Sequence, residues 1–568
     1  MIKKHLPLLI GFFITISLLW PLFYAPYFTH HDDVQVIRLH QMNKCIQDLQ
    51  IPCRWVPDVG GLYGYPLFNY YAPLPYYFGE IIYLLSGGLI FSSKVMFAIS
   101  FIGAFLFMYL FARKFWGELG GSLSAIFYSL APYHALDFYV RGAMGEMWAL
   151  MFFPAILWAS IRLYEKANIF NLTLFAIFLA GLATSHNLSL MIFIPVTIIW
   201  LTFLYIKKRN HKFLLYSLLS FLIAFLLSCF YILPVLFEKS MVHVDTTTVG
   251  YFSYTEHFKG IKKLFLEREW GYGSSIREVP GGEEDKLSYQ IGWVHILGWI
   301  LAIYVSKLYW QKNRWVSYVI IFSSAIIIFS IFMIHPRSDF IWKLIPFLKY
   351  LQFPWRLLII ITLFISFLSG SIFLEKAFLK WRKWLWLSLT ILVLGSNFLY
   401  FSPEKFVYKT DEEYLSGQNW VKQIMRSNFD FLPIFAKEPA AFPAKDRYEI
   451  LTGETTIEDF QQGSNWFKFR AETYSHSIIR LSQYYFPNWK VFVDGKETPI
   501  DYQSNSLGLM TLILGEGTHA IEARLYDTPI RSIANLLTIL GLALTLVIFM
   551  ISFKKVRLWI SYYRRGIN

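Results

Sequence analysis

The chain has 568 residues, of which 56% are hydrophobic and only 16% are charged, and its net charge is +14. A soluble protein would carry roughly a quarter charged residues, whereas the apolar runs here are each long enough to cross a hydrocarbon core of ~30 Å. The basic residues stand in short clusters between those runs and form no basic face interleaved with aromatics, which argues against a nucleic-acid-binding protein and for a polytopic membrane protein.

Twelve apolar segments have the length of membrane spans. They cover residues 6–24, 94–112, 118–136, 147–163, 170–185, 188–206, 213–236, 291–306, 315–334, 355–374, 383–400 and 531–552. The first follows a basic start and has no small-x-small cleavage site after it, which is typical of an uncleaved first span. The segment 77–91 is ambiguous, because it is apolar but contains Glu80 and the pair Gly87-Gly88.

The basic clusters indicate how the segment 77–91 lies. They cover residues 3–4, 113–114, 162–166, 207–212, 307–314, 376–383 and 554–565. If 77–91 does not cross the membrane, every cluster is cytoplasmic, as the positive-inside rule requires; if it crosses, all but the first face outward. We therefore predict that 77–91 is a juxtamembrane or re-entrant helix on the outer face of the cytoplasmic membrane, and that both termini are cytoplasmic.

This topology places six connections outside, and the last of them is the one sizeable soluble domain. The six are residues 25–93, 137–146, 185–187, 237–290, 335–354 and 401–530. From Trp466 onward the last connection alternates like β-strands, with a hairpin signal at Asp494-Gly495 and a turn at Gly515 to Gly517. The expected fold class is mainly α, with about twelve spans in all: a transmembrane bundle in 1–400, a β-sandwich or jelly roll in 401–530, and the last span with a basic cytoplasmic tail in 531–568. Residues 401–465 are weakly patterned and remain unassigned.

The first outer connection contains the main catalytic candidates, Asp32 and Asp33, directly after the first span. Partial desolvation at the membrane boundary strengthens a carboxylate as a base, so either residue could take a proton from an acceptor hydroxyl. The alternative to a catalytic role is that Asp32 and Asp33 are a solvated N-terminal cap of the amphipathic segment 34–49. His30 and His31 precede the pair, but no spacing matches a zinc site, so no cofactor is predicted and a divalent metal is the less favoured alternative.

Arginines and aromatic residues of the outer connections could bind a lipid-linked substrate. Arg54, Arg141 and Arg356 are candidate phosphate ligands, because a guanidinium pairs with phosphate through two hydrogen bonds; lipid headgroups or acidic partners are the alternative. Arg141 and Glu146 bracket one short connection and could form an ion pair with each other. The aromatic, Gly- and Pro-rich run 60–77 could stack on sugars or form an interfacial belt. The remaining substrate-binding candidates are His31, Arg38, Asp58, Tyr65, Asn69, Tyr71, Glu146 and His186. Cys45 and Cys53 could form a disulfide on an oxidising face.

The layout resembles the GT-C superfamily of integral-membrane glycosyltransferases, which have an acidic pair after the first span and amphipathic outer helices. The runs HDD, IPCRWVPD, YGYPLFNYYAPLPYY, APYHALDFYVRGAMGE, SHN and LQFPWR resemble more closely a bacterial membrane family catalogued as 6-pyruvoyl-tetrahydropterin synthase-related. The pterin label has no support in these residues, since no soluble domain carries a zinc-binding histidine set. The run YYFPNWKVFVDGKE resembles the outer β-domain of another GT-C-like family implicated in envelope glycosylation.

The resemblance implies an inverting transfer from a polyprenyl-phosphate sugar to an envelope glycan, lipid or protein on the outer face, with an Asp as base. That base corresponds to Asp32, with Asp33 as the fallback, because HHDDVQ lacks the expected glycine before HD and has residues such as Gln35 where a histidine is expected. The rival hypotheses are a transporter or flippase for lipid-linked glycans and a non-catalytic scaffold that displays the β-domain. A transporter would require charges at mid-depth, and the predicted spans have almost none.

Overall fold

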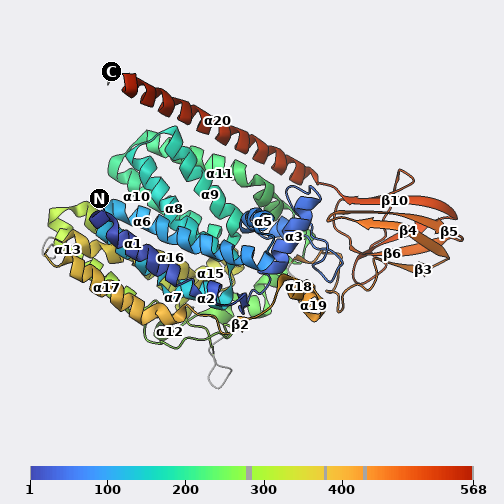
Figure 1. Cartoon of the computed structure of the whole chain (residues 1–568), viewed down its shortest axis with the longest axis horizontal. Helices are drawn as coiled ribbons and strands as arrows, with labels where there is room; N and C mark the ends of the chain where they lie inside the picture. The colour runs from blue at the N-terminus through green and yellow to red at the C-terminus, as the bar shows by residue number, and fades with distance from the viewer. Residues whose placement is uncertain (1, 277–284, 376–379, 427–430, 566–568) are drawn as a thin grey trace.

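The computed structural model describes residues 2–276, 285–375, 380–426 and 431–565, and shows a helical bundle joined end-on to a β-sandwich (Figure 1). Position 376 of one basic cluster and positions 277–284 of the connection 237–290 lie outside the described residues. Both chain termini lie at the end of the bundle away from the β-sandwich (Figure 1). The predicted fold class, a mainly helical membrane protein with a C-terminal β-domain, is confirmed.

A helix lies in each predicted span. The bundle helices are α1 (Ile2–Ser17), α2 (Trp20–Tyr24), α6 (Leu89–Ser129), α8 (Met144–Glu165), α9 (Ile169–Ser185), α10 (Asn187–Lys208), α11 (His211–Phe237), α13 (Trp293–Lys312), α14 (Arg314–Ile334), α16 (Leu358–Ser369), α17 (Arg382–Asn397) and α20 (Pro529–Arg565). Within the described residues, seven helical segments are long and apolar enough to cross a membrane by length and composition, and α1 and α9 are shorter apolar helices. The number of spans therefore stays a prediction.

Helix α6 contains two of the predicted spans, because it folds back on itself at Gly117. This glycine has φ 72° and ψ −173°, a conformation that other residues rarely adopt. After it, a Cβ on Gly121 would lie 2.6 Å from the Cβ of Arg113, whereas eight residues of a straight helix would separate them by ~12 Å. The second arm ends at Ser129, earlier than predicted, because Pro132 follows and Ala131 before it is extended.

The ambiguous segment 77–91 forms α5 (Leu74–Ser86), which ends at Gly87 in the left-handed conformation (φ 71°). Thirteen helical residues reach only ~20 Å, which is too short to cross ~30 Å of hydrocarbon. Helix α6 then begins at Leu89, and its first two amides donate to the carboxylate of Asp411 at 2.6 and 2.9 Å. An acidic group at a helix N-terminus is stabilising, so a residue from the far end of the sequence fixes this turn.

The predicted orientation is tested by labelling engineered cysteines with a membrane-impermeant thiol reagent. Helix α10 starts beside the connection 137–146, and its 22 residues carry the exposed Lys208 ~33 Å away. We expect Lys208→Cys to react only after permeabilisation of cells and Glu412→Cys to react in intact cells. Reaction of Lys208→Cys in intact cells would show that the bundle has the opposite orientation.

The β-domain is a sandwich of two antiparallel sheets. Its strands are β3 (Tyr448–Thr452), β4 (Thr455–Gln462), β5 (Trp466–Thr473), β6 (Ser477–Tyr484), β7 (Trp489–Val493), β8 (Lys496–Thr498), β9 (Leu509–Leu514) and β10 (Gly517–Leu525). One sheet has the order β4-β5-β10-β7-β8 and the other β3-β6-β9. The hairpin signal is confirmed between β7 and β8, where Asp494 (φ 52°) and Gly495 (φ 78°) both have positive φ. Strand β5 alternates buried and exposed residues, so its inner face forms part of the core.

The last part of the unassigned segment 401–465 forms β3 and β4 of the sandwich. Its described residues before β3 join the two parts of the molecule. They contain β2 (Phe406–Val407), α18 (Asp411–Tyr414) and α19 (Gly417–Ile424). Strand β2 pairs with β1 (Tyr27–Phe28) just before Asp32, and α19 lies with α3 (Gln35–Gln47) where the bundle meets the β-domain (Figure 1). The connection 25–93 is thus in contact with a segment some 380 positions later in the chain.

Cys45 and Cys53 form a disulfide that closes the turn after α3, and the third cysteine, Cys229, is free and buried. The bridge closes a loop with a sequence separation of 8, for which the loss of unfolded-state entropy stabilises a protein by about 2–3 kcal/mol. We expect Cys45→Ser/Cys53→Ser to lower the free energy of unfolding by that amount, measured in denaturant against a Cys229→Ser control. Three free thiols in non-reducing mass analysis would contradict the bridge.

Candidate functional site

Asp32 is held against the connection 137–146 by backbone hydrogen bonds. The amides of His31 and Asp32 donate to the carbonyls of Val140 and Arg141, each at 2.9 Å. Gly142 follows with φ 63°, and a Cβ there would lie 2.4 Å from the His30 ring, so only glycine permits this approach. Two connections that are about a hundred residues apart in the sequence, 25–93 and 137–146, therefore build one site.

Asp32 and Asp33 have different surroundings. The carboxylate of Asp33 accepts a hydrogen bond from the Tyr414 hydroxyl at 3.1 Å and lies 3.9 Å from the Arg426 guanidinium, so it holds the segment 401–447 in place. Asp32 is exposed, and its carboxylate has no hydrogen-bond or ion-pair partner among the described residues. Asp32 is the carboxylate that is available to a substrate.

A buried group of charges lies beside Asp32, on the connection 137–146 and on the turn Pro354–Leu357 just before α16. One nitrogen of Arg141 donates to Asp137 and also to Glu146, the latter at 2.8 Å. Glu146 lies 3.7 Å from Nε of Arg356 and accepts the Tyr133 hydroxyl at 2.5 Å. The predicted pairing of Arg141 with Glu146 is therefore present. All of these side chains are at least nine-tenths buried, and Nε of Arg356 donates no hydrogen bond.

Arg38 of α3 is a second cationic group whose charge interacts with that of Asp32. Its guanidinium lies 3.9 Å from the centre of the Tyr71 ring and donates to the Tyr76 hydroxyl at 3.4 Å. No carboxylate within the described part of the chain pairs with it. The charge of Asp32 acts electrostatically on both Arg38 and Arg141. The exposed carboxylate thus lies within electrostatic range of cationic groups from two segments of the chain, α3 and the connection 137–146.

Two histidines support this arrangement. His186 packs against Gly145, where a Cβ would lie 3.2 Å from its ring, and its Nδ1 lies 2.6 Å from the Ser189 hydroxyl. Burial lowers the pKa of His186 to about 4, so the ring is neutral at neutral pH. His31 donates from Nε2 to the Tyr272 carbonyl at 2.8 Å and so attaches the connection 237–290 to the site. Across the described residues, no three His, Cys, Asp or Glu side chains form a metal-binding group.

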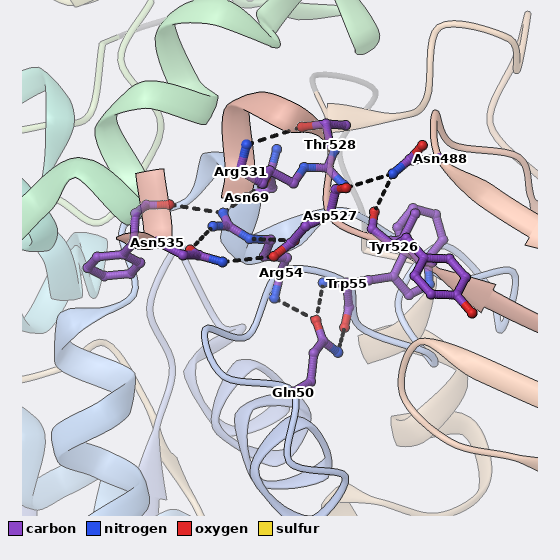
Figure 2. A network of polar contacts seen from close by, with 12 residues as sticks. Gln50, Arg54, Trp55, Asn69, Asn488, Tyr526, Asp527, Thr528, Arg531 and Asn535 are labelled. Atoms are coloured by element: carbon purple, nitrogen blue, oxygen red, sulfur yellow. Dashed lines mark hydrogen bonds and ion pairs between the residues drawn. The ribbon is translucent and has the colours of Figure 1, made fainter. Parts of the chain in front are cut away.

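Four residues that the sequence suggested as phosphate- or substrate-binding do not lie with the residues around Asp32. Asp58 accepts hydrogen bonds from Gln41 and Lys44 of α3 at 2.7 and 2.6 Å and so stabilises that helix. The hydroxyl of Tyr65 accepts a hydrogen bond from the Phe431 amide at 3.1 Å. Arg54 and Asn69 belong to a network that joins the first outer connection to the start of α20 (Figure 2). Their side chains contact each other, Asn535, Glu238, Asp527 and the Phe230 carbonyl, and not the residues around Asp32.

The structure adds residues that sequence reasoning did not select. Asp137 was missed although it stands four residues before Arg141, the spacing of an ion pair on one helical face. Gln35 bridges the site by donating to the carbonyls of Asp32 and Gly142 at 3.1 and 2.8 Å. Tyr414 and Arg426 carried no signal, because only the tertiary fold brings them to Asp33.

Comparison with known proteins does not assign the chain to a family. No protein-family model matches it. An uncharacterized protein of Lactococcus lactis subsp. cremoris (strain MG1363) is 25% identical over 234 residues, which are 39% of this chain and 38% of that protein. The crystal structure of the Archaeoglobus fulgidus oligosaccharyltransferase, in complex with Zn and sulfate, aligns over 77% of this chain and 59% of its own with a TM-score of 0.39 and 13% identity. The chain thus spans less than two thirds of either protein: 38% of the first and 59% of the second.

Proposed function

We propose that the protein is a GT-C-type membrane glycosyltransferase that transfers a sugar from a polyprenyl-phosphate donor to an envelope glycan, lipid or protein on the outer face of the cytoplasmic membrane. The observation that carries this proposal is the exposed, unpartnered carboxylate of Asp32 beside the guanidinium groups of Arg38 and Arg141. A general base next to phosphate-binding cations is the combination that such a transfer requires.

In the proposed reaction, Asp32 takes the proton of an acceptor hydroxyl as its oxygen attacks the anomeric carbon of the donor. The bond from that carbon to the phosphate oxygen breaks, and polyprenyl phosphate leaves from the opposite side, so the configuration inverts. Asp33 is unsuited to this role, because its carboxylate already binds Tyr414 and lies close to Arg426.

The arginines stabilise the charge that develops on the leaving phosphate. Arg38 has no carboxylate partner in the described structure, and Nε of Arg356 is a buried donor without a hydrogen bond, so both can serve a phosphate. Arg141 is held in place by Asp137 and Glu146 and contributes a fixed positive charge. Tyr71, stacked under Arg38, offers an aromatic face beside the sugar.

The test is a structure of the purified protein with undecaprenyl phosphate, the donor without its sugar. We expect the phosphate between Arg38 and Arg356, within hydrogen-bond distance of at least one of them, and facing Asp32. Binding of the lipid only at other surfaces, with this position empty, would refute the proposed donor site.

A further inference from the structure

A cavity of about 370 Å³ lies away from Asp32, where the first outer connection, the end of β10 and the start of α20 meet. Three arginines line it, Arg54, Arg524 and Arg531, against a single acidic residue, Asp527. Its remaining wall includes Leu49 and Ile51, which are 82% and 66% exposed. The cavity therefore combines an excess of positive charge with apolar surface at the first turn of a membrane helix.

Two of these arginines are buried and have unused hydrogen-bond donors. Arg54 is 5% exposed and donates to Asn69, Asn535 and the Phe230 carbonyl, but its Nε has no hydrogen bond and lies 3.6 Å from Asp527 (Figure 2). Arg531 is 1% exposed; its Nε donates to Glu238 at 2.8 Å, and its Nη2 has no partner. A buried donor without an acceptor is costly, so these groups favour a ligand that supplies one.

The third arginine completes the site from the β-domain. Arg524 is exposed on β10, and no acidic side chain in the described residues forms an ion pair with it. Burial, opposed by Asp527, lowers the pKa of Arg54 to about 10, so its guanidinium group is still charged at neutral pH. The single carboxylate of Asp527 is also engaged by the Asn535 amide at 2.8 Å.

We propose that this cavity binds a phosphate group, and that the exposed Leu49 and Ile51 beside it favour the phosphate of a membrane lipid over free phosphate. The paired N–H donors of a guanidinium group match the spacing of two phosphate oxygens. Clustered basic residues at a membrane boundary bind anionic lipid headgroups. The site is separate from the one at Asp32 and does not depend on the proposed transferase activity. A lipid bound there would join the β-domain, the first outer connection and α20.

The test is equilibrium binding of two probes, dihexanoyl phosphatidic acid and inorganic phosphate, to the full-length protein in detergent. The variant is Arg524→Ala, and the matched control is Arg470→Ala, an exposed arginine on the neighbouring strand β5 that does not line the cavity. Loss of one charge-assisted contact should weaken binding about tenfold in Arg524→Ala and leave the control unchanged. Asp527→Asn, which removes the only acidic residue of the lining, should strengthen binding.

The two probes separate the possible sources of the phosphate. Tighter binding of phosphatidic acid identifies a lipid headgroup, and equal or tighter binding of inorganic phosphate identifies a soluble ligand; either supports the site if Arg524→Ala weakens it. Arg38→Gln tests whether the probes also bind at the Asp32 site. We expect Arg524→Ala to weaken probe binding by the same factor whether or not Arg38→Gln is present. If the Arg524→Ala and Arg470→Ala variants have the same affinity for both probes, no phosphate site exists in this cavity.

Discussion

Asp32→Asn is expected to slow sugar transfer by about 10²–10⁴-fold, the contribution of a positioned general base. Asparagine has nearly the same shape but cannot accept the acceptor's proton. Because the carboxylate of Asp32 has no partner among the described residues, its removal leaves no other side chain unsatisfied, and the fold should be unchanged. The measurement is formation of glycosylated product by purified protein supplied with lipid-linked sugar donor, alongside the melting temperature.

The matched control is Asp33→Asn, at the adjacent position. Its amide oxygen can still accept the Tyr414 hydroxyl, and the loss of a partly exposed charge 3.9 Å from Arg426 costs at most ~1 kcal/mol. Activity should stay within about fivefold of the wild type. If the large loss occurred in Asp33→Asn and not in Asp32→Asn, the two roles would be exchanged. If both variants were fully active, no carboxylate in this pair would be the base.

The elements that could be predicted from the sequence are those whose signals lie within a few consecutive residues. Apolar length located the helices, and alternation with Asp494-Gly495 located the β7–β8 hairpin, because both signals are contained in a few consecutive residues. Within the unassigned segment 401–465, the described elements before β3 could not be predicted, because they are short and are stabilised by distant partners. Strand β2 exists only through its pairing with β1, and α18 is a single turn between Asp411 and Tyr414.

In the site, too, contacts between residues close in sequence could be predicted and contacts between distant residues could not. The pairing of Arg141 with Glu146 could be predicted, because both residues lie in one short connection. The arginines could not be sorted from the sequence: Arg141 and Arg356 converge on Glu146, whereas Arg54 joins Asp527 and Asn535 at the other end of the first connection. Nor does composition distinguish Asp32 from Asp33; the difference lies in Tyr414 and Arg426, which only the folded chain brings there.

Glu238→Ala is expected to lower the free energy of unfolding by about 3–5 kcal/mol, because it leaves the guanidinium of Arg531 buried without its carboxylate. Both side chains are 1% exposed and 2.8 Å apart, and Glu238 also accepts the Thr528 hydroxyl and the Asn69 amide. This pair fixes the start of α20 to the end of α11, so its loss should loosen the attachment of the β-domain to the bundle. The measurement is denaturant unfolding of the purified protein.

Two further variants show whether the effect comes from the buried charge. Glu449→Ala removes an exposed carboxylate 3.7 Å from Arg480 and should change stability by at most ~1 kcal/mol. Glu238→Met/Arg531→Met removes both charges together and should be more stable than Glu238→Ala alone, since no isolated ion then remains buried. If the double variant were as unstable as Glu238→Ala, the loss would come from the hydrogen bonds of Thr528 and Asn69, and the ion pair would not be what attaches α20 to the bundle.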